Sequence, residues 1–348
     1  MHDFPSAITK KRGWPCDANV PKVNGIASNS RTWPRVSVVT PSYNQAQYIE
    51  ETIRSVLLQG YPNLEYILID GGSTDGSVET IRRYEAWMTY WVSEKDRGMC
   101  HAINKGWTRA TGEILAWLNS DDLYLPGGIY RAVLALEACN DCALVYGDGL
   151  RINESGRVLD LLKSAPLDIR LLLTGKSQYG IPQPTVFMKR SAVEEVNGLD
   201  EAMVMAMDYD LWLKIALRRR LHYIEGPPLA ALRLHCDQKT QRYIYEDRKF
   251  SLVALDRALV DSRCPKEVSK RESVTYTKLH LDLAVLVCRK NKGFRSSIRY
   301  FMGAFANKPF YALKIIISDL LVGLFRMITP EPLKRAIRRM RRIDVQTS

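Results

Sequence analysis

The chain has 348 residues, of which 46% are hydrophobic and 25% charged, a composition typical of a globular protein with a buried core. Its formal net charge of +12 is concentrated near the C-terminus, where residues 289–348 hold 14 Lys and Arg but only 3 Asp and Glu. The remaining residues, with 36 basic and 35 acidic groups, are nearly neutral. This distribution argues against a nucleic-acid partner for the main fold.

The seven cysteines are odd in number and scattered, which is not the pattern of a disulfide framework. Cys139 and Cys142 form a single C-x-x-C without a second pair, so a zinc site is disfavoured. The N-terminus lacks the apolar core of a signal peptide, and no run of 18 uncharged apolar residues predicts a membrane span. We therefore expect the active part to work in reducing cytoplasm.

Strands and helices are predicted to alternate after a proline-containing, mobile lead-in. Short apolar runs predict strands, and apolar residues at three- and four-residue spacing predict helices. In the first half, strands are expected at 36–40, 64–69, 90–93 and 113–118, with helices at 48–57, 77–85 and 102–109. In the second half, strands are expected at 143–147 and 184–189, with helices at 191–196, 209–219 and 243–288.

This alternation predicts right-handed crossovers and an α/β fold with a mainly parallel central sheet flanked by helices. Ligands bind beyond the carboxyl ends of such strands. Polar or glycine-rich loops follow all four strands of the first half, at 41–44, 70–75, 94–98 and 119–122, so one site is expected there. The expected organisation is a lead-in (1–34), a catalytic domain (35–240, with a donor half 35–125 and an acceptor half 140–240) and a helical C-terminal extension (241–348).

Asp121 and Asp122 are the most informative pair in these loops. Two adjacent carboxylates repel one another unless a cation or a hydrogen-bonded partner neutralises them. Oxygen ligands suit Mn²⁺ or Mg²⁺, which also bind the phosphates of nucleotides. Asp70 can accept a hydrogen bond from a base or ribose, and Tyr43 can stack on a base. The glycine loop after Asp70 matches neither the dinucleotide-binding nor the P-loop pattern.

Several segments resemble the family-two glycosyltransferases of the GT-A fold. They are Val36-Ser-Val-Val-Thr-Pro-Ser-Tyr-Asn44, Ile67-Leu-Ile-Asp-Gly-Gly-Ser-Thr-Asp-Gly76 and Leu118-Asn-Ser-Asp-Asp122. Glu94-Lys-Asp-Arg-Gly98 with Ala102-Ile-Asn-Lys-Gly106 resembles a stretch common in bacterial members. The resemblance covers residues 35–240 and implies an inverting transferase that uses a nucleoside-diphosphate sugar and Mn²⁺ or Mg²⁺.

The resemblance also implies site residues on the donor side. The nucleoside would be contacted by Pro41, Tyr43, Asp70 and Asp96. Asp121 and Asp122 correspond to the D-x-D region, which contacts ribose, diphosphate and metal. Asn119 stands where many relatives have the first Asp, so which of the two carboxylates ligates the metal stays open.

Residues further along the chain would complete the site. Met207-Asp-Tyr-Asp-Leu-Trp-Leu213 resembles the segment of the catalytic base, with Met207 in place of the usual Glu, and Asp208 aligns with the base. The alternative is that Asp208 and Asp210 merely start a helix. Gln183 would contact the acceptor. Arg233 would bind phosphate, and His235 would complete the metal shell or offset phosphate charge.

The basic tail predicts where the protein works. Residues 310–325 are apolar on one side, and residues 333–343 contain six Lys and Arg. This combination is typical of a segment lying on an anionic membrane surface, here the inner face of the plasma membrane. Such a location would suit a lipid-linked or surface-polysaccharide acceptor. The alternatives are a solvated helix and a nucleic-acid contact.

Two other functions stay open. A non-catalytic nucleotide-sugar-binding scaffold is suggested by the substitutions at Asn119 and Met207. A sugar nucleotidyltransferase is less favoured, because it would need a glycine-rich basic loop after the first strand, which residues 40–47 lack.

Overall fold

The computed structural model describes residues 4–8, 13–16, 32–174, 180–268, 274–289, 294–310 and 312–316. These residues form two compact units. The first contains the described residues up to 173 and residues 180–265, and the second contains Thr174 and the described residues from 266 onward. The basic segment at 333–343 lies outside the described residues.

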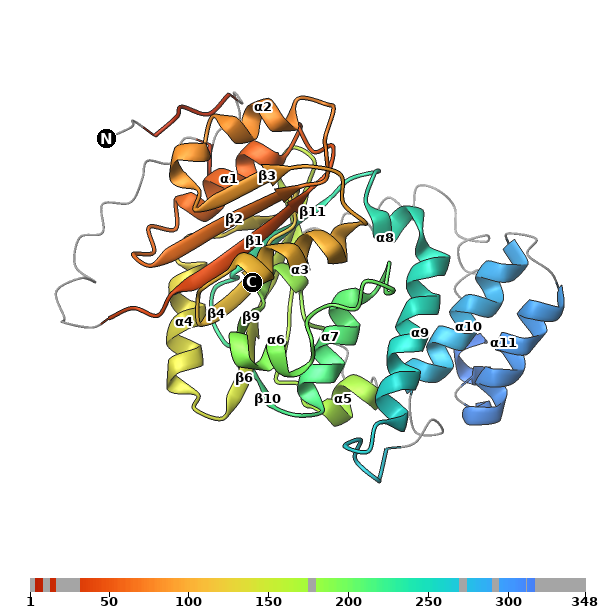
Figure 1. Ribbon diagram of the computed structural model, residues 1–348. Helices are drawn as coiled ribbons and strands as arrows, with labels where there is room; N and C mark the ends of the chain where they lie inside the picture. Colours follow the sequence, from red (N-terminus) through yellow and green to blue (C-terminus); the bar gives the residue numbers. More distant parts are fainter. Residues whose placement is uncertain are drawn as a thin grey trace, which may run out of the picture. The chain divides into compact units, whose positions relative to one another are not determined.

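The first unit holds every described strand and most of the helices (Figure 1). Its strands are β1 (Val36–Ser42), β2 (Leu64–Asp70), β3 (Tyr90–Ser93), β4 (Ile114–Trp117), β5 (Leu123–Tyr124), β6 (Cys142–Gly147), β7 (Gly149–Asn153), β8 (Val158–Leu162), β9 (Phe187–Lys189), β10 (Arg220–Ile224) and β11 (Ala230–Leu234). Its helices are α1 (Ile49–Leu57), α2 (Ser77–Arg82), α3 (Met99–Arg109), α4 (Gly128–Ala138), α5 (Ile169–Thr174, whose last residue belongs to the second unit), α6 (Arg190–Glu195), α7 (Met207–Ala216), α8 (Lys239–Arg242) and α9 (Ile244–Val260). Single 3-10 turns occur at Glu85–Trp87 and Gln183–Thr185.

The main sheet has seven strands in the order β10-β6-β9-β4-β1-β2-β3. All neighbours run parallel except β9, which is antiparallel to both β4 and β6. The expected α/β fold with a mainly parallel sheet is therefore confirmed. A second, four-stranded sheet, in the order β5-β11-β7-β8, was not expected from the sequence.

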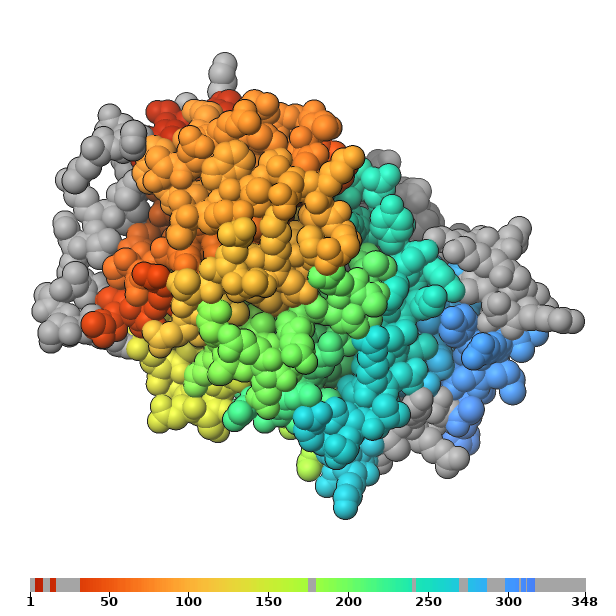
Figure 2. Space-filling model, in the orientation of Figure 1, coloured from red at the N-terminus to blue at the C-terminus, as the bar shows by residue number. Residues whose placement is uncertain are grey.

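Side chains that alternate along the strands of the main sheet belong to two hydrophobic clusters, one on each face of the sheet. Val36 and Val38 of β1 belong to the cluster that includes α1, α2 and α4, whereas Val39 belongs to the one that includes α3, α6 and α7. Figure 2 shows the two halves of the unit adjoining on one surface, the first half in orange and the second in green and teal. Helices on both faces leave the strand ends as the place for a site.

One local prediction differs from the structure. The strand expected at 184–189 begins only at Phe187, and the preceding residues form a 3-10 turn, since Pro184 has no N–H to donate to a strand neighbour.

The helices expected at 243–288 are present, as α9 in the first unit and as a helix at Val274–Arg289 in the second. Of these, α9 contacts α7 within the first unit, which extends to residue 265.

Part of the N-terminal segment is anchored to α1 by buried charged side chains. Ile8 N donates to the carboxylate of Glu50 at 2.9 Å, and Arg54 donates to the carbonyls of Pro5 at 2.7 Å and Pro15 at 3.1 Å. Glu50 and Arg54 are both almost fully buried. A mobile lead-in does not fit these contacts for residues 4–8 and 13–16, because the buried charges need the backbone groups of this segment as partners.

The second unit contains α10 (Val274–Arg289) and α11 (Phe294–Asn307), which pack against one another. Leu281, Ala304 and Ala312 form its hydrophobic cluster. The helical C-terminal extension is thus confirmed for the described residues. Within the same residues, no helix is long and apolar enough to cross a membrane.

The close approach of α3 to β1 depends on Gly106. A Cβ at this position of α3 would lie 2.4 Å from Cγ1 of Val39 on β1. We expect Gly106→Ala to lower the free energy of unfolding by about 1 kcal/mol or more, because overpacking outweighs the better helix propensity of alanine. Urea denaturation measures this change. Gly180→Ala, where a Cβ meets nothing within 4 Å, is the matched control and should stay within about 0.5 kcal/mol.

Candidate active site

A cleft of about 660 Å³ lies in the first unit, beyond the carboxyl ends of β1, β2 and β4. Its volume is within the range of small-molecule sites. Among the predicted site residues, the cleft is lined by Pro41, Tyr43, Asp96, Asp121, Asp122, Gln183, Asp208 and His235. Asp70 and Arg233 are not among the lining residues. The structure therefore gathers most, but not all, of the predicted residues around one space.

The loop after β2 is held closed by Asp70. This fully buried carboxylate accepts hydrogen bonds from Gly72 N at 3.1 Å, Ser73 N at 2.9 Å and Ser93 Oγ at 2.7 Å. Asn44 joins the loops after β1 and β2, because its Oδ1 accepts from Thr74 N at 2.9 Å. Asp70 thus shapes the rim of the cleft, and the expected contact with a nucleoside does not fit a carboxylate engaged in its own loop.

Tyr43 and Asp96 remain open to a ligand at this end of the cleft. The Tyr43 ring is 62% exposed, so its face is free to stack on a planar group. Asp96 lies directly against Gly71, where a Cβ would approach its Oδ2 to 2.8 Å. Glycine at position 71 therefore allows the Asp96 carboxylate to lie at the cleft wall.

Asp121 and Asp122 differ sharply in surroundings. Asp122 is 2% exposed, and burial together with the negative charge of Asp121 raises the pKa of its carboxyl well above the usual range. Its Oδ1 accepts a hydrogen bond from Arg233 N at 2.9 Å. Asp121 is more accessible, and its Oδ2 lies 2.9 Å from Nε2 of His235. The Asp121 carboxylate and the His235 ring therefore face the cleft as a pair.

Arg233 supports this acidic loop from behind. Its side chain is fully buried and pairs with Glu51 of α1 at 2.9 Å, while its Nε donates to the carbonyl of Asp121 at 2.9 Å. Its Nη1 donates to the carbonyls of Asn153 and Glu154. The Arg233 guanidinium, expected to bind phosphate, is engaged by these internal partners and does not line the cleft.

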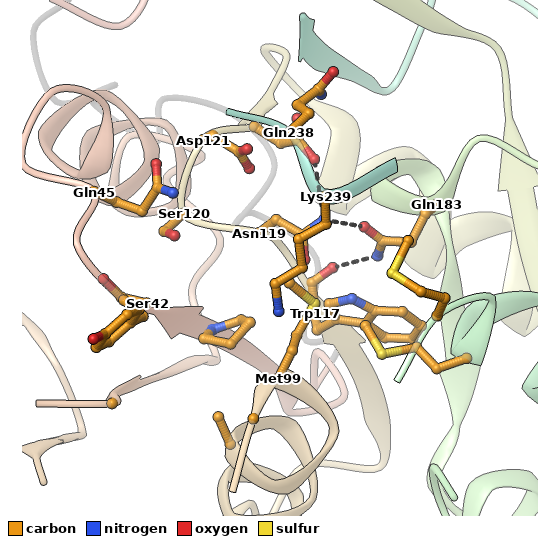
Figure 3. Close-up of a pocket in the computed structure, with 18 of the residues that line it drawn as sticks. Ser42, Gln45, Met99, Trp117, Asn119, Ser120, Asp121, Gln183, Gln238 and Lys239 are labelled. Carbon is orange, nitrogen blue, oxygen red and sulfur yellow. Dashed lines mark hydrogen bonds between the residues drawn. The ribbon is translucent and has the colours of Figure 1, made fainter. Parts of the chain in front are cut away.

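Gln183, predicted to contact an acceptor, lines the cleft with both ends of its amide in use. Its Nε2 donates to the carbonyl of Trp117 at 3.0 Å, and its Oε1 accepts from Nδ2 of Asn119 at 3.1 Å. Figure 3 shows these bonds joining the three residues on one side of the space. Gln183 thus holds Asn119 in a defined orientation.

Asp208 lies in the first turn of α7, and its side chain contributes to the wall of the cleft. Burial raises the pKa of its carboxyl, which suits a group that takes up a proton. The preceding Ala206 has a φ of 54°, a left-handed conformation that costs an alanine roughly 1 kcal/mol. Asp210 instead pairs with Lys214 at 2.6 Å and with Arg257 at 3.5 Å. Of the two acids, only Asp208 lines the cleft.

Four charged residues in the cleft wall were missed from the sequence: Lys95, Asp237, Lys239 and Asp247. The two lysines bring positive charge to a wall that also holds Asp96, Asp121 and Asp208. Asp247 comes from α9, and burial together with the charge of Asp208 raises the pKa of its carboxyl. Lys239 lies only four residues after His235, and this closeness in sequence is the signal by which Lys239 could have been predicted to line the cleft.

Comparisons with known proteins place the chain in a family. A model described as glycosyl transferase family 2 matches residues 37–196. An uncharacterized glycosyltransferase of Mycobacterium tuberculosis is 34% identical over 187 residues, which are 53% of this chain and 70% of that relative. The chain belongs to glycosyl transferase family 2, and the resemblance seen in its motifs is confirmed.

Other relatives are more partial. A putative teichuronic acid biosynthesis glycosyltransferase of Bacillus subtilis is 36% identical over 138 residues, covering 38% of this chain and 54% of the relative. An uncharacterized glycosyltransferase of Rickettsia bellii is 29% identical over 255 residues, 71% of this chain, which spans only 36% of that relative's length.

Solved structures share the fold. The mannosyltransferase PcManGT of Pyrobaculum calidifontis, in complex with GDP-Man and Mn²⁺, superposes with a TM-score of 0.56 at 21% identity, over 87% of this chain and 83% of that chain. TarS 1–349 of S. aureus, in complex with UDP-GlcNAc, gives a TM-score of 0.55 at 16% identity, over 82% of this chain and 92% of that chain. The GT-A fold implied by the resemblance is therefore confirmed.

The buried pair of Arg233 and Glu51 should make a large contribution to stability. Arg233→Met would leave the Glu51 carboxylate without its guanidinium partner, and we expect a loss of about 3 kcal/mol or more in the free energy of unfolding. Arg219→Met is the matched control, because Arg219 pairs with Glu195 at 3.0 Å on an exposed surface. That change should cost less than about 1 kcal/mol by chemical denaturation. Equal effects of the two substitutions would contradict the role assigned to Arg233.

Proposed function

We propose that the cleft binds a nucleoside-diphosphate sugar and that the chain transfers the sugar, with inversion, to a hydroxyl acceptor. The observation that carries this proposal is the set of groups that line the cleft. An exposed tyrosine lies at the end of β1, Asp121 after β4 pairs with His235 after β11, and Asp208, whose carboxyl has a raised pKa, lies in the first turn of α7. These groups suit the nucleoside base, the diphosphate and the attacking hydroxyl, respectively.

The diphosphate would lie near Asp121, His235 and Lys239. Negative phosphates need cationic neighbours, and Lys95 and Lys239 are the lysines of the described cleft wall. Arg233 would act indirectly, by holding the backbone of Asp121. This assignment replaces the direct phosphate contact first expected from Arg233.

Asp121 and His235 also fit a divalent cation shared with the diphosphate. Among the described residues, no cluster of three or more His, Cys, Asp or Glu side chains is placed to hold a metal by itself. Mg²⁺ and similar ions often use only one or two protein carboxylates and complete their shell with phosphates and water. Asp122 would support the site by accepting the hydrogen bond from Arg233 N, and Asp121 is the more accessible ligand. When bound, Mn²⁺ or Mg²⁺ would stabilise the negative charge of the leaving diphosphate.

Asp208 would act as the general base. The acceptor hydroxyl oxygen forms a bond to the anomeric carbon while the bond from that carbon to the phosphate oxygen breaks. The hydroxyl proton passes to the Asp208 carboxylate, and the nucleoside diphosphate leaves from the opposite face. A single displacement of this kind inverts the anomeric configuration. Asp208 is well suited to this role because desolvation raises the pKa of its carboxyl, which strengthens it as a base.

The acceptor is proposed to be a lipid-linked or surface-polysaccharide precursor. The similarity to the putative teichuronic acid biosynthesis glycosyltransferase supports a polysaccharide. The basic tail supports an acceptor presented at a membrane, to which the chain would bind peripherally from the cytoplasmic side.

Asp208→Asn should lower transfer by about a hundredfold or more while leaving nucleotide-sugar binding intact, because only the proton acceptor is lost. Transfer and hydrolysis are measured with a panel of UDP-, GDP- and dTDP-sugars in the presence of Mn²⁺. Asp210→Asn is the matched control from the same helical turn. It should reduce stability through its pairs with Lys214 and Arg257 but keep turnover per folded molecule.

The pH profile and a chelator complete this test. The base acts when deprotonated, so the rate should fall as the pH decreases through the raised pKa of Asp208. This fall should occur at a higher pH than for an ordinary aspartate. Activity that is unchanged by both the chelator and Asp208→Asn would contradict the mechanism. Tight nucleotide binding without any turnover would instead favour the scaffold alternative.

Membrane association can be tested on the full chain with phosphatidylcholine vesicles that contain or lack phosphatidylglycerol. Each basic residue near an anionic surface contributes about 1 kcal/mol. Replacing Arg338, Arg339, Arg341 and Arg342 by glutamine should therefore weaken co-sedimentation with anionic vesicles by about a hundredfold or more. Replacing the exposed Arg219 and Arg220 is the control and should have little effect. Equal binding of both variants would contradict the role of the tail.

A further inference from the structure

Three buried polar atoms of cleft-lining residues have no hydrogen-bond partner within the described part of the chain: Oγ of Ser42, Nε1 of Trp117 and Oδ1 of Asn119. Ser42 ends β1, whereas Trp117, which is only 1% exposed, and Asn119 lie at or just after the end of β4. A buried donor or acceptor without a partner costs about 1–3 kcal/mol. Such groups at the wall of a cleft therefore point to a ligand that supplies the missing bonds.

The orientation of the atoms of Trp117 and Asn119 is set by their neighbours. Nδ2 of Asn119 donates to Gln183 Oε1 at 3.1 Å and approaches Asp122 Oδ2 at 3.4 Å, which leaves Oδ1 as the unused acceptor. The Trp117 ring is stacked on Trp212, with ring centroids 5.3 Å apart. Its backbone carbonyl accepts from Gln183 Nε2 (Figure 3). A fixed N–H donor and a fixed C=O acceptor thus lie two residues apart along the chain.

This pair of groups selects a class of ligand. A phosphate offers only acceptors and would be repelled by the Asn119 oxygen. A hydroxyl can accept a hydrogen bond from an N–H and can donate one to a C=O. Neighbouring hydroxyls of a sugar ring therefore match Trp117 and Asn119, whereas a diphosphate does not.

The position of Trp117 and Asn119 in the cleft indicates that they bind the sugar that is transferred. Asn119 is two residues before Asp121, which faces the proposed diphosphate. Trp212, which stacks on Trp117, lies on α7, the helix that begins with Asp208. The sugar that is transferred must lie between these two ends, because its anomeric carbon is joined to the diphosphate and is attacked by the hydroxyl at the base.

We infer that Nε1 of Trp117 and Oδ1 of Asn119 bind hydroxyls of the transferred sugar and so help to select the donor. The inference rests on the proposed function. It assigns a neutral donor–acceptor pair to the sugar, beside the charged groups assigned to the diphosphate and the metal. Asn119 thereby has a role in ligand binding of its own.

The test compares the binding of a nucleoside-diphosphate sugar with that of the bare nucleoside diphosphate, by calorimetry on the full chain. The sugar nucleotide is the one that binds the unmodified protein best. Trp117→Phe and Asn119→Ala should each weaken binding of the sugar nucleotide by about tenfold, as expected for one lost hydrogen bond to a buried group. Binding of the bare diphosphate should stay unchanged in both, which also shows that the variants are folded.

Trp107→Phe is the matched control. Trp107 packs against Trp117 with centroids 5.6 Å apart, and its Nε1 is likewise buried and unpartnered, but it does not line the cleft. This variant should bind both ligands as the unmodified protein does. If Trp107→Phe also weakened binding of the sugar nucleotide, the effect would come from core packing, and the inference would be overturned.

Donor analogues that lack single sugar hydroxyls sharpen the result. One deoxy analogue should bind the unmodified protein about tenfold more weakly and should lose nothing further with Trp117→Phe, because the same bond is absent in both cases. If the loss of binding caused by Trp117→Phe added fully to the loss caused by the missing hydroxyl for every analogue, the inference would be overturned. If no nucleoside diphosphate and no sugar nucleotide bound the unmodified protein, the proposed function would be overturned instead, so the two failures are distinguishable.

Discussion

The buried pair of Arg233 and Glu51 holds the cleft together. Arg233 sits on β11, and Glu51 sits on α1, so the ion pair at 2.9 Å joins segments 182 residues apart. The same guanidinium donates to the carbonyl of Asp121, and the Arg233 N–H donates to the Asp122 carboxylate. Two adjacent acids are thereby kept in one defined loop despite their mutual repulsion, and this loop carries Asp121, which is proposed to lie near the diphosphate.

In the loops after β1 and β2, some polar side chains hold the loop and others face the cleft. The side chains of Asp70 and Asn44 make hydrogen bonds that stabilise the turns after β1 and β2. Those turns place Tyr43 and Asp96 at the cleft wall, where they remain open. A motif residue therefore matters either by touching a ligand or by shaping the loop that does, and only the hydrogen bonds distinguish the two. Substitution of Asp70 would act on the rim of the cleft as a whole.

The tryptophans connect the end of β4 to α7. Trp117 ends β4, packs edge-on against Trp107 of α3 and stacks on Trp212 of α7. This cluster sets the distance between the end of β4 and the first turn of α7, where Asp208 lies. Because interiors are densely packed, α7 cannot shift without moving the end of β4. The proposed sugar contact of Trp117 therefore lies at the joint between the two halves.

The sequence by itself determined the alternating strands and helices, the edge of the sheet where the cleft lies, and the acids Asp96 and Asp121 at that edge. It could do so because hydrophobic periodicity and strand-end loops are local properties of the chain. It did not show that Asp70 and Arg233 lie behind the cleft wall, and it missed Lys95, Asp237, Lys239 and Asp247 in that wall. Burial and hydrogen-bond partners decide those roles, and both depend on residues that only the fold brings together. The pairing of β11 with β5, which sets Arg233 behind the acidic loop, joins strands more than a hundred residues apart, and no local pattern encodes it.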